Sequence, residues 1–138
     1  MATTTATFSL ASSDLTGDQL ALSTTTNLNK AGTLTGLDQT TGVSRTIIAA
    51  ASTTKTIADA SEYATGPAKN HKVYVKMLST VATEYVTLSV DSQDIGRLYA
   101  GDFAFIPFGA DDATHDVKVT TPTGQTNTSI EYIVIHQA

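Results

Sequence analysis

Hydrophobic and polar residues alternate along much of the second half of the chain. In the segment 72–79, Val73, Val75 and Met77 occupy every second position, and every second residue of 86–90 is likewise Val or Leu. A period of two is typical of strands that have one buried and one solvated face. The pattern therefore predicts two half-buried strands in this region.

Short apolar segments continue to the end of the sequence, at 95–99, 103–108, 116–120 and 129–136. Turn-forming residues separate them, and the turn at 91–94 predicts that 95–99 returns as the hairpin partner of the strand before it. A helical turn is expected only at 58–64, before Gly66 and Pro67. Closely spaced short strands predict an all-β fold, an antiparallel β-sandwich or jelly-roll-like barrel.

Residues 1–52 differ in composition from residues 53–138. Of the 26 Thr residues, 16 precede residue 60, whereas Phe8 is the only aromatic residue there and eight aromatic residues follow. Because aromatic side chains dominate cores, we expect the sandwich domain within 53–138. Two interpretations of 1–52 stay open: an extended Thr-rich arm that becomes ordered on another molecule, or outer strands. Removal of residues 1 to about 45 is expected to leave a folded domain and weaken attachment.

The segment 103–108 is apolar on both faces. Phe103 and Phe105 share one face, and Ile106 and Phe108 share the other. One interpretation is a central strand buried on both sides, in which Phe105 belongs to the core and its truncation to Ala costs about 3–5 kcal/mol. The other is that one face packs against a second subunit. Pro107 has no N–H for a ladder hydrogen bond, which predicts an edge or bulged position.

The last segment repeats this doubly apolar pattern. Ile133 and Ile135 lie on one face, and the other carries Ile130, Tyr132 and Val134. Two such strands in a short chain favour an oligomer. The candidate contacts with another subunit or a shell are Phe103, Phe105, Phe108, Ile133 and Ile135.

Composition excludes several classes of function. With eight Lys and Arg residues and a net charge of −5, the chain lacks the basic patch of a nucleic-acid-binding protein. It has no Cys for disulfides or thiolate chemistry, and no apolar run long enough to cross a membrane. The first residues lack the basic region and apolar core of a signal peptide. We expect neither nucleic acid nor membrane as a partner.

Candidate catalytic and metal-binding residues do not form recognisable motifs. His71, His115 and His136 are too far apart for a typical metal site, and we expect them to be solvated. The acidic residues Asp111, Asp112 and Asp116 lack the alternating pattern of a calcium loop. Glu84 and Glu131 are placed on outward faces, and no nucleophile-elbow or phosphate-loop motif occurs. We therefore predict no enzymatic activity, no cofactor and no metal.

Several segments together resemble a known family. At 98–102 the sequence L-x-x-G-D ends one strand and turns into the aromatic strand that ends in Pro107 and Phe108. With the strands 72–76, 116–119 and 130–134, this pattern resembles small structural proteins of tailed bacteriophages, many of them marine or cyanobacterial. The resemblance covers about residues 53–138 and does not extend to 1–52.

The resemblance implies a virion component assembled in the host cytoplasm. Because small phage β-sandwiches tend to occupy three-fold or quasi-three-fold positions, it also implies that the oligomer is a homotrimer. A capsid decoration (cement) protein, bound to the major capsid protein or other virion proteins, is the first expectation, and a head-fibre or tail subunit is the alternative. A cement protein stabilises the expanded shell by binding that state alone.

A carbohydrate-binding adhesive β-sandwich is a further alternative. Tyr63, Tyr99 and Asp102 are its candidate sugar contacts, although the chain has no Trp to stack on a sugar.

Overall fold

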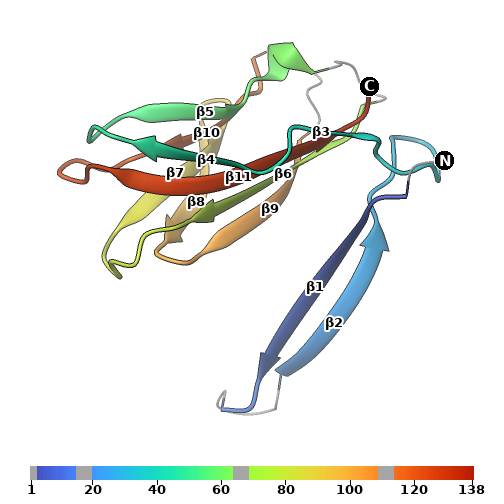
Figure 1. Ribbon diagram of the computed structural model, residues 1–138, viewed down its shortest axis with the longest axis horizontal. Helices are drawn as coiled ribbons and strands as arrows, with labels where there is room; N and C mark the ends of the chain where they lie inside the picture. The colour runs from blue at the N-terminus through green and yellow to red at the C-terminus, as the bar shows by residue number, and fades with distance from the viewer. Residues whose placement is uncertain (1–2, 15–19, 64–68, 109–113) are drawn as a thin grey trace.

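Two antiparallel sheets pack face to face, and a separate two-stranded hairpin projects from one end of them (Figure 1). This computed structural model describes residues 3–14, 20–63, 69–108 and 114–138. The prediction of an all-β fold with a sandwich arrangement is confirmed. Gly66 and Pro67, which are expected to end the helical turn at 58–64, lie outside the described residues.

The first sheet has four strands in the order β5 (Thr54–Ala58), β10 (Val117–Thr120), β7 (Tyr85–Val90) and β8 (Gln93–Tyr99). The second has the order β3 (Gln39–Thr40), β11 (Thr128–His136), β6 (His71–Met77) and β9 (Phe103–Phe108), and β4 (Ser44–Ile48) also pairs with β11. The hairpin consists of β1 (Thr5–Ser12) and β2 (Leu20–Asn27). The predicted pairing of β7 with β8 is confirmed, with a register shift after Leu88.

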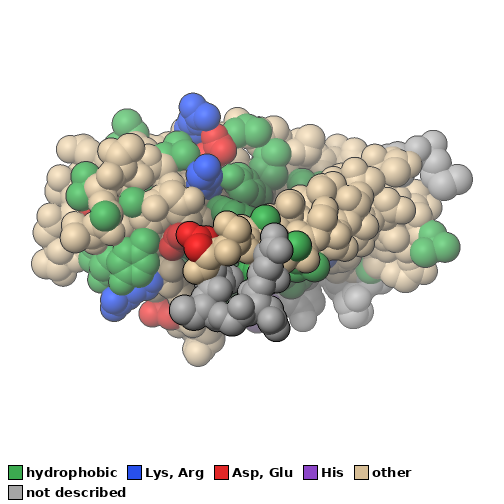
Figure 2. All heavy atoms as spheres, turned by 90° about the horizontal axis from the view of Figure 1, so that it is seen from below, with side chains coloured by type: hydrophobic (Ala, Val, Ile, Leu, Met, Phe, Trp, Pro, Cys, Tyr) green, Lys and Arg blue, Asp and Glu red, His purple; other side chains and the backbone are tan. Residues whose placement is uncertain are grey.

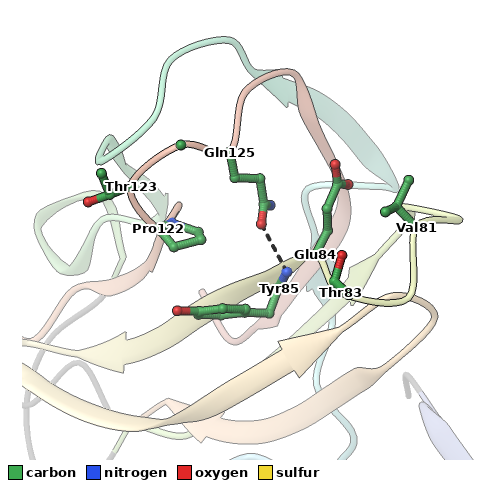
Figure 3. Close-up of a pocket in the computed structure, with 8 residues that line it drawn as sticks. Val81, Thr83, Glu84, Tyr85, Pro122, Thr123 and Gln125 are labelled. Atoms are coloured by element: carbon green, nitrogen blue, oxygen red, sulfur yellow. Dashed lines mark hydrogen bonds between the residues drawn. The ribbon is translucent and has the colours of Figure 1, made fainter.

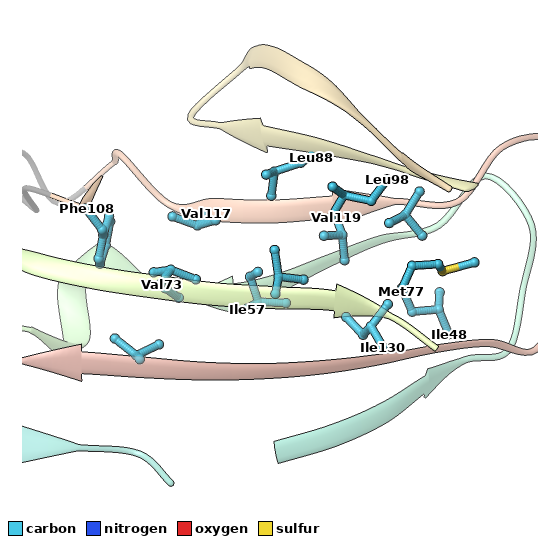
Figure 4. Close-up of a cluster of buried hydrophobic side chains, with 14 of the residues drawn as sticks. Ile48, Ile57, Val73, Met77, Leu88, Leu98, Phe108, Val117, Val119 and Ile130 are labelled. Carbon is cyan, nitrogen blue, oxygen red and sulfur yellow. The ribbon is translucent and has the colours of Figure 1, made fainter. Parts of the chain in front are cut away.

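The core lies between the two sheets, and among the described residues it consists mainly of aliphatic side chains after residue 53, with Phe108 as its one buried Phe or Tyr (Figure 4). Each strand contributes the side chains of one face, because strand residues alternate in direction. The fully buried members include Val73, Val75, Met77, Val86, Leu88, Val117, Val119, Ile130 and Val134. The 3-10 turn Ala60–Glu62 follows β5 within the predicted helical turn, and Asp59 caps it.

Strands β3 and β4 together run along one side of β11. Ser44 to Ile48 pair with Tyr132 to Thr128, and Thr40 pairs with Ile135. Between β3 and β4, the Thr41 hydroxyl accepts a hydrogen bond from Val134 N–H at 3.0 Å, and Thr41 N–H donates to the Val134 carbonyl at 3.0 Å. Residues 39–48 are therefore outer strands of the sandwich, although they precede residue 53.

Hydrogen bonds hold the base of the hairpin to the sandwich. Leu28 N–H donates to the Thr4 carbonyl at 2.7 Å, and Leu37 N–H donates to the Leu28 carbonyl at 2.7 Å. The side-chain oxygen of Gln137 accepts from Ala31 N–H at 3.1 Å and from Asn70 N–H at 3.2 Å. The base is thus anchored beside the end of β11, while the strands of the hairpin extend away from it (Figure 1).

Two truncations should separate the hairpin from the sandwich. Deletion of residues 1–27 removes β1 and β2 and should leave a melting temperature within about 5 °C of the full chain. Deletion of residues 1–45 also removes β3 and part of β4, which leaves one side of β11 unpaired. Its melting temperature should fall by more than about 10 °C. Circular dichroism melts of both proteins test this, and an equal loss in the two would contradict it.

Candidate functional site

Strand β9 presents an apolar surface on the outer side of the second sheet. Phe103 is 51% exposed and Phe105 is 40% exposed, whereas Phe108 points inward and is 2% exposed. The prediction that Phe103 and Phe105 share one face is confirmed. The prediction that Phe105 belongs to the core is wrong, because its side chain lies on the outer face of β9 and is not packed between the two sheets. We call the outer side chains of Phe103 and Phe105 the apolar wall.

The edge position of β9 follows from Pro107. This residue pairs with Lys72 of β6 on one side, and none of the described strands pairs with β9 on the other. Because proline lacks an N–H, an edge strand tolerates it and a central strand does not. The prediction of an edge or bulged position at Pro107 is thus confirmed.

Tyr74 of β6 extends the apolar wall. It is opposite Phe105 in the register, and its ring centroid lies 6.2 Å from that of Phe103. Burial raises the pKa of the Tyr74 hydroxyl above its usual value, and the charge of Glu131 adds to the rise. Burial also lowers the pKa of the Lys72 ammonium on the same face. The outer face is therefore partly desolvated even in a single chain.

The hairpin has one apolar face, and that face points toward the apolar wall. The register pairs Leu10 with Leu22 and Phe8 with Thr24, so these side chains share a face. Phe8, Leu10 and Leu22 are all exposed. The described parts of β1 and β2 contain no charged residue, and Thr7 and Thr25 share a hydrogen bond of 2.9 Å on the opposite face.

A recess of about 490 Å³ lies between the hairpin and the apolar wall. It is lined by Ala6, Phe8, Leu10, Thr24, Thr26, Phe103 and Phe105. Figure 2 shows hydrophobic side chains gathered in a hollow in the middle of this face, with charged side chains at its border. A hollow with this lining has few groups for orienting a polar substrate, and it suits contact with another apolar surface.

The other candidate contact residues lie apart from this recess. Ile133 and Ile135 are half-buried on the outer face of β11, where they line a cavity of about 300 Å³ with residues 37–40. Phe108 packs in the core and its ring lies 5.9 Å from that of Tyr63. The structure therefore places Phe103, Phe105, Ile133 and Ile135 on the same outer face of the second sheet, where Tyr74 pairs with both Phe105 and Ile133, and only Phe108 lies on the inner face.

A second hollow, of about 390 Å³, lies between the loops before β7 and before β11 (Figure 3). We call it the loop hollow. The Tyr85 ring lies along it with Pro122 close by, and Val81, Thr83 and Glu84 border its other side. Ser79 donates a short hydrogen bond to the Glu84 carboxylate.

Gln125 joins the two loops of this hollow. Its side-chain oxygen accepts a hydrogen bond from Tyr85 N–H at 3.0 Å, and its side-chain nitrogen donates to the Thr128 hydroxyl at 2.7 Å (Figure 3). Both Gln125 and Thr128 are buried, so neither bond is replaced by water when the amide is lost.

Gln125→Leu should therefore destabilise the chain by about 2–4 kcal/mol, because it leaves two buried polar groups unpaired. Gln125→Glu is the matched control, because its protonated carboxyl group can accept from Tyr85 N–H and donate to the Thr128 hydroxyl. Its loss should be small at acidic pH and larger at neutral pH, where burial penalises the carboxylate. Urea unfolding of the three proteins measures the difference. A leucine variant as stable as the parent would show that the amide does not join these loops.

The candidate sugar contacts do not form one site. The Tyr99 and Tyr85 rings lie 5.3 Å apart, and the Arg97 guanidinium lies 4.5 Å from the centre of the Tyr85 ring. Asp102 accepts from Tyr99 N–H at 3.0 Å. Tyr63 lies beside His71 at the start of β6, whereas Asp102 lies beside Met77 at the end of that strand.

The expectation of solvated histidines is wrong for His71. Its side chain is buried, and Nδ1 accepts a hydrogen bond from Gln137 N–H at 3.3 Å. Its ring lies 6.0 Å from that of His136 and 5.8 Å from that of Tyr63. The sequence places His71 at the start of a strand, and only the tertiary packing covers it.

Neither a metal-binding cluster nor a membrane-spanning helix is found among the described residues. Within those residues, no group of three or more His, Asp or Glu side chains is placed to hold a metal ion. No helical segment in the described ranges has the length and apolar character to span a bilayer. The sequence candidates Asp111 and Asp112 lie outside the described residues.

The fold and the recess define an antiparallel β-sandwich with an attached apolar hairpin. Comparison of the chain with protein-family models, curated proteins and solved structures found no match.

Proposed function

We propose that this chain is a non-enzymatic structural subunit of a bacteriophage particle, a decoration (cement) protein that binds the head shell. The observation that carries the proposal is the uncovered apolar surface formed by the hairpin and the apolar wall. The resemblance of the strands after residue 72 to small phage structural proteins supports the choice of a virion.

The apolar surface has enough unburied area to drive assembly. Phe8, Leu10, Leu22, Phe103 and Phe105 are each at least 40% exposed. Complete burial of one such side chain contributes about 1.5–3 kcal/mol, so covering the exposed part of five contributes several kcal/mol per copy. When many copies bind to one shell, their summed binding free energy favours the expanded state of the shell, to which the copies bind.

The two hollows support a binding role over a catalytic one. The recess presents aromatic, aliphatic and threonine side chains. The loop hollow has Glu84 as its one lining carboxylate, and Ser79 already bonds to it. Acid–base hydrolysis of a glycoside needs two carboxyl groups across a cleft.

The proposed partner of the chain is a virion protein, and its proposed location is the virion. We propose the major capsid protein or another virion protein as the partner, with the subunit itself a homotrimer. Assembly takes place in the host cytoplasm, and the mature location is the virion. The net charge of −5 supports a partner other than nucleic acid or an anionic membrane surface.

Purification of the phage particle that carries this chain tests the function. We expect a copy number comparable to that of the major shell protein, and shells stripped of the chain should rupture at lower temperature or milder osmotic shock. Rebinding should be strong on expanded shells and weak on unexpanded ones. A handful of copies per particle would favour the head-fibre or tail alternative, and absence from the particle would overturn the proposal.

The loop hollow supports a second candidate, a glycan-binding adhesive. The Tyr85 ring is flanked by Tyr99 and Arg97 and lies beside the Thr123 and Gln125 side chains, a combination of stacking face and hydrogen-bonding groups. Binding to a panel of bacterial surface glycans that Tyr85→Ala abolishes would favour this candidate.

A further inference from the structure

A buried histidine lies where the end of the chain meets the base of the hairpin. His71 begins β6, and its side chain is buried. The centre of its ring lies 5.9 Å from that of Phe108, 5.8 Å from that of Tyr63 and 6.0 Å from that of His136. Burial disfavours the charged form of an imidazole.

The hydrogen bond between His71 and Gln137 requires a neutral imidazole. Nδ1 of His71 accepts from Gln137 N–H at 3.3 Å. A ring nitrogen accepts only while it carries no proton, and both nitrogens of a protonated imidazole are donors. A proton at Nδ1 would therefore set two N–H groups against each other, and the bond would break.

Gln137 connects this histidine with the base of the hairpin. Its side-chain oxygen accepts from Ala31 N–H at 3.1 Å and from Asn70 N–H at 3.2 Å. The Asn70 side-chain nitrogen in turn donates to the Asn29 carbonyl at 2.9 Å, and both Asn29 and Ala31 belong to the segment that follows β2. Gln137 therefore joins the end of the chain, the start of β6 and the hairpin base.

We propose that His71 is a pH-sensitive switch, which holds the base of the hairpin at neutral pH and releases it in acid. In the closed state the neutral ring holds Gln137 in place, and in the open state their bond is broken. Below about pH 6.5 the open state takes up a proton that the closed state cannot bind. The stability of the closed state therefore falls as the pH falls. This inference does not depend on the proposed function.

Two of the segments packed around His71 contribute no group that titrates in this range. In the segment after β5, burial raises the pKa of the Tyr63 hydroxyl, and the charges of Glu62 and Asp59 add to the rise. The hydroxyl therefore stays protonated in acid. Phe108 of β9 contributes an uncharged ring.

Two lysines flank His71 in the sequence. Lys69 Nζ donates to the Ala138 carbonyl at 2.9 Å, and the Lys72 ammonium bonds to the side-chain oxygen of Asn70. Nearby positive charges disfavour a further positive charge at a buried imidazole, so they favour the open state when His71 is protonated.

Strand β11 contributes the second imidazole, that of His136. Its Nδ1 lies 3.4 Å from the Gln137 carbonyl, so a proton at this nitrogen would strengthen the contact. At the hairpin base, the hydrogen bond from Lys30 lowers the pKa of the Asp38 carboxyl, which therefore stays ionised in mild acid. The release in acid is thus assigned to His71.

The test follows the full chain by NMR from about pH 8 to about pH 4.5. The amide signals of Ala31, Asn70 and Gln137 should move with the same midpoint as the ring nitrogens of His71. Protection of these amides from hydrogen exchange, corrected for the intrinsic rate, should fall about 30-fold at about pH 5, the effect of a proton that only the open state binds. Protection of the Val119 amide, in the middle of the first sheet, should change less than about 2-fold.

Two variants assign the change to one histidine. In His71→Asn the amide oxygen takes the position of Nδ1 and accepts without titrating, so the base should stay anchored throughout the pH range. His136→Gln is the matched control and should keep the pH dependence of the parent. If His71→Asn does not fold, the titration of the parent and the control still decide.

Several results would overturn the inference. One is a His71 ring that stays neutral over the whole range, and another is a ring that titrates while the amides of Ala31 and Gln137 keep their protection. Retention of the pH dependence in a folded His71→Asn protein, or its loss in His136→Gln, would also assign the release to a different group.

Discussion

Phe108→Ala should lower the free energy of unfolding by about 3–5 kcal/mol. The Phe108 ring is 2% exposed and packs against Tyr63 and His71, with ring centroids 5.9 Å away in both cases. Truncation leaves a cavity that the surrounding sheets cannot close, in addition to the lost transfer free energy. Urea unfolding of the variant and the parent measures the loss.

Phe105→Ala is the matched control, on the same strand and with the same change. Because Phe105 is 40% exposed, we expect a smaller loss in the single chain. Equal losses in the two variants would contradict the placement of the two rings.

Val75→Asp should abolish the cooperative melt altogether. Val75 is fully buried at the middle of β6, between Tyr132 of β11 and Ala104 of β9. A carboxylate there has no cationic neighbour in the register, and an unpaired buried charge costs at least several kcal/mol. A domain of this size has about 5–15 kcal/mol of stability in total.

Lys76→Asp provides the control for this prediction. Lys76 is the next residue of β6 and lies on the outer face, opposite Phe103 and Glu131. The variant should fold, with a loss of about 1 kcal/mol from strand propensity and the nearby acid. Thermal melts followed by circular dichroism separate the two outcomes, and a folded Val75→Asp protein would contradict the assigned face of β6.

The sequence pattern was sufficient to predict the strands after residue 70 and their faces. Alternation identifies which residues share a face, and Pro107 identified the edge strand. Alternation does not tell whether a second layer of the fold covers a given face. For this reason the pattern predicts a buried Phe105, whereas the structure exposes it. Pro107 is the better guide, because a proline without an N–H disfavours hydrogen-bonded strands on both sides of β9.

The pairings between distant segments could not be predicted from local pattern. β4 lies against β11, where Arg45 Nε donates to the Glu131 carboxylate at 2.7 Å across 86 residues of sequence. Nothing near Arg45 in the sequence indicates that partner. The apolar face of the hairpin was equally hidden, since Phe8 and Leu22 come together only through the register of β1 and β2.

The position of β11 also determines when the second sheet can form during synthesis. β11 follows β3, β4 and β6 in the sequence, yet it lies between them and supplies the ladder hydrogen bonds of all three. β3 and β4 therefore have no described partner until residues 128–136 are made, and β6 has only β9. Formation of this sheet should be slow, because closure of such long loops precedes any gain from pairing. During that delay, chaperones have access to the strands that β11 later covers.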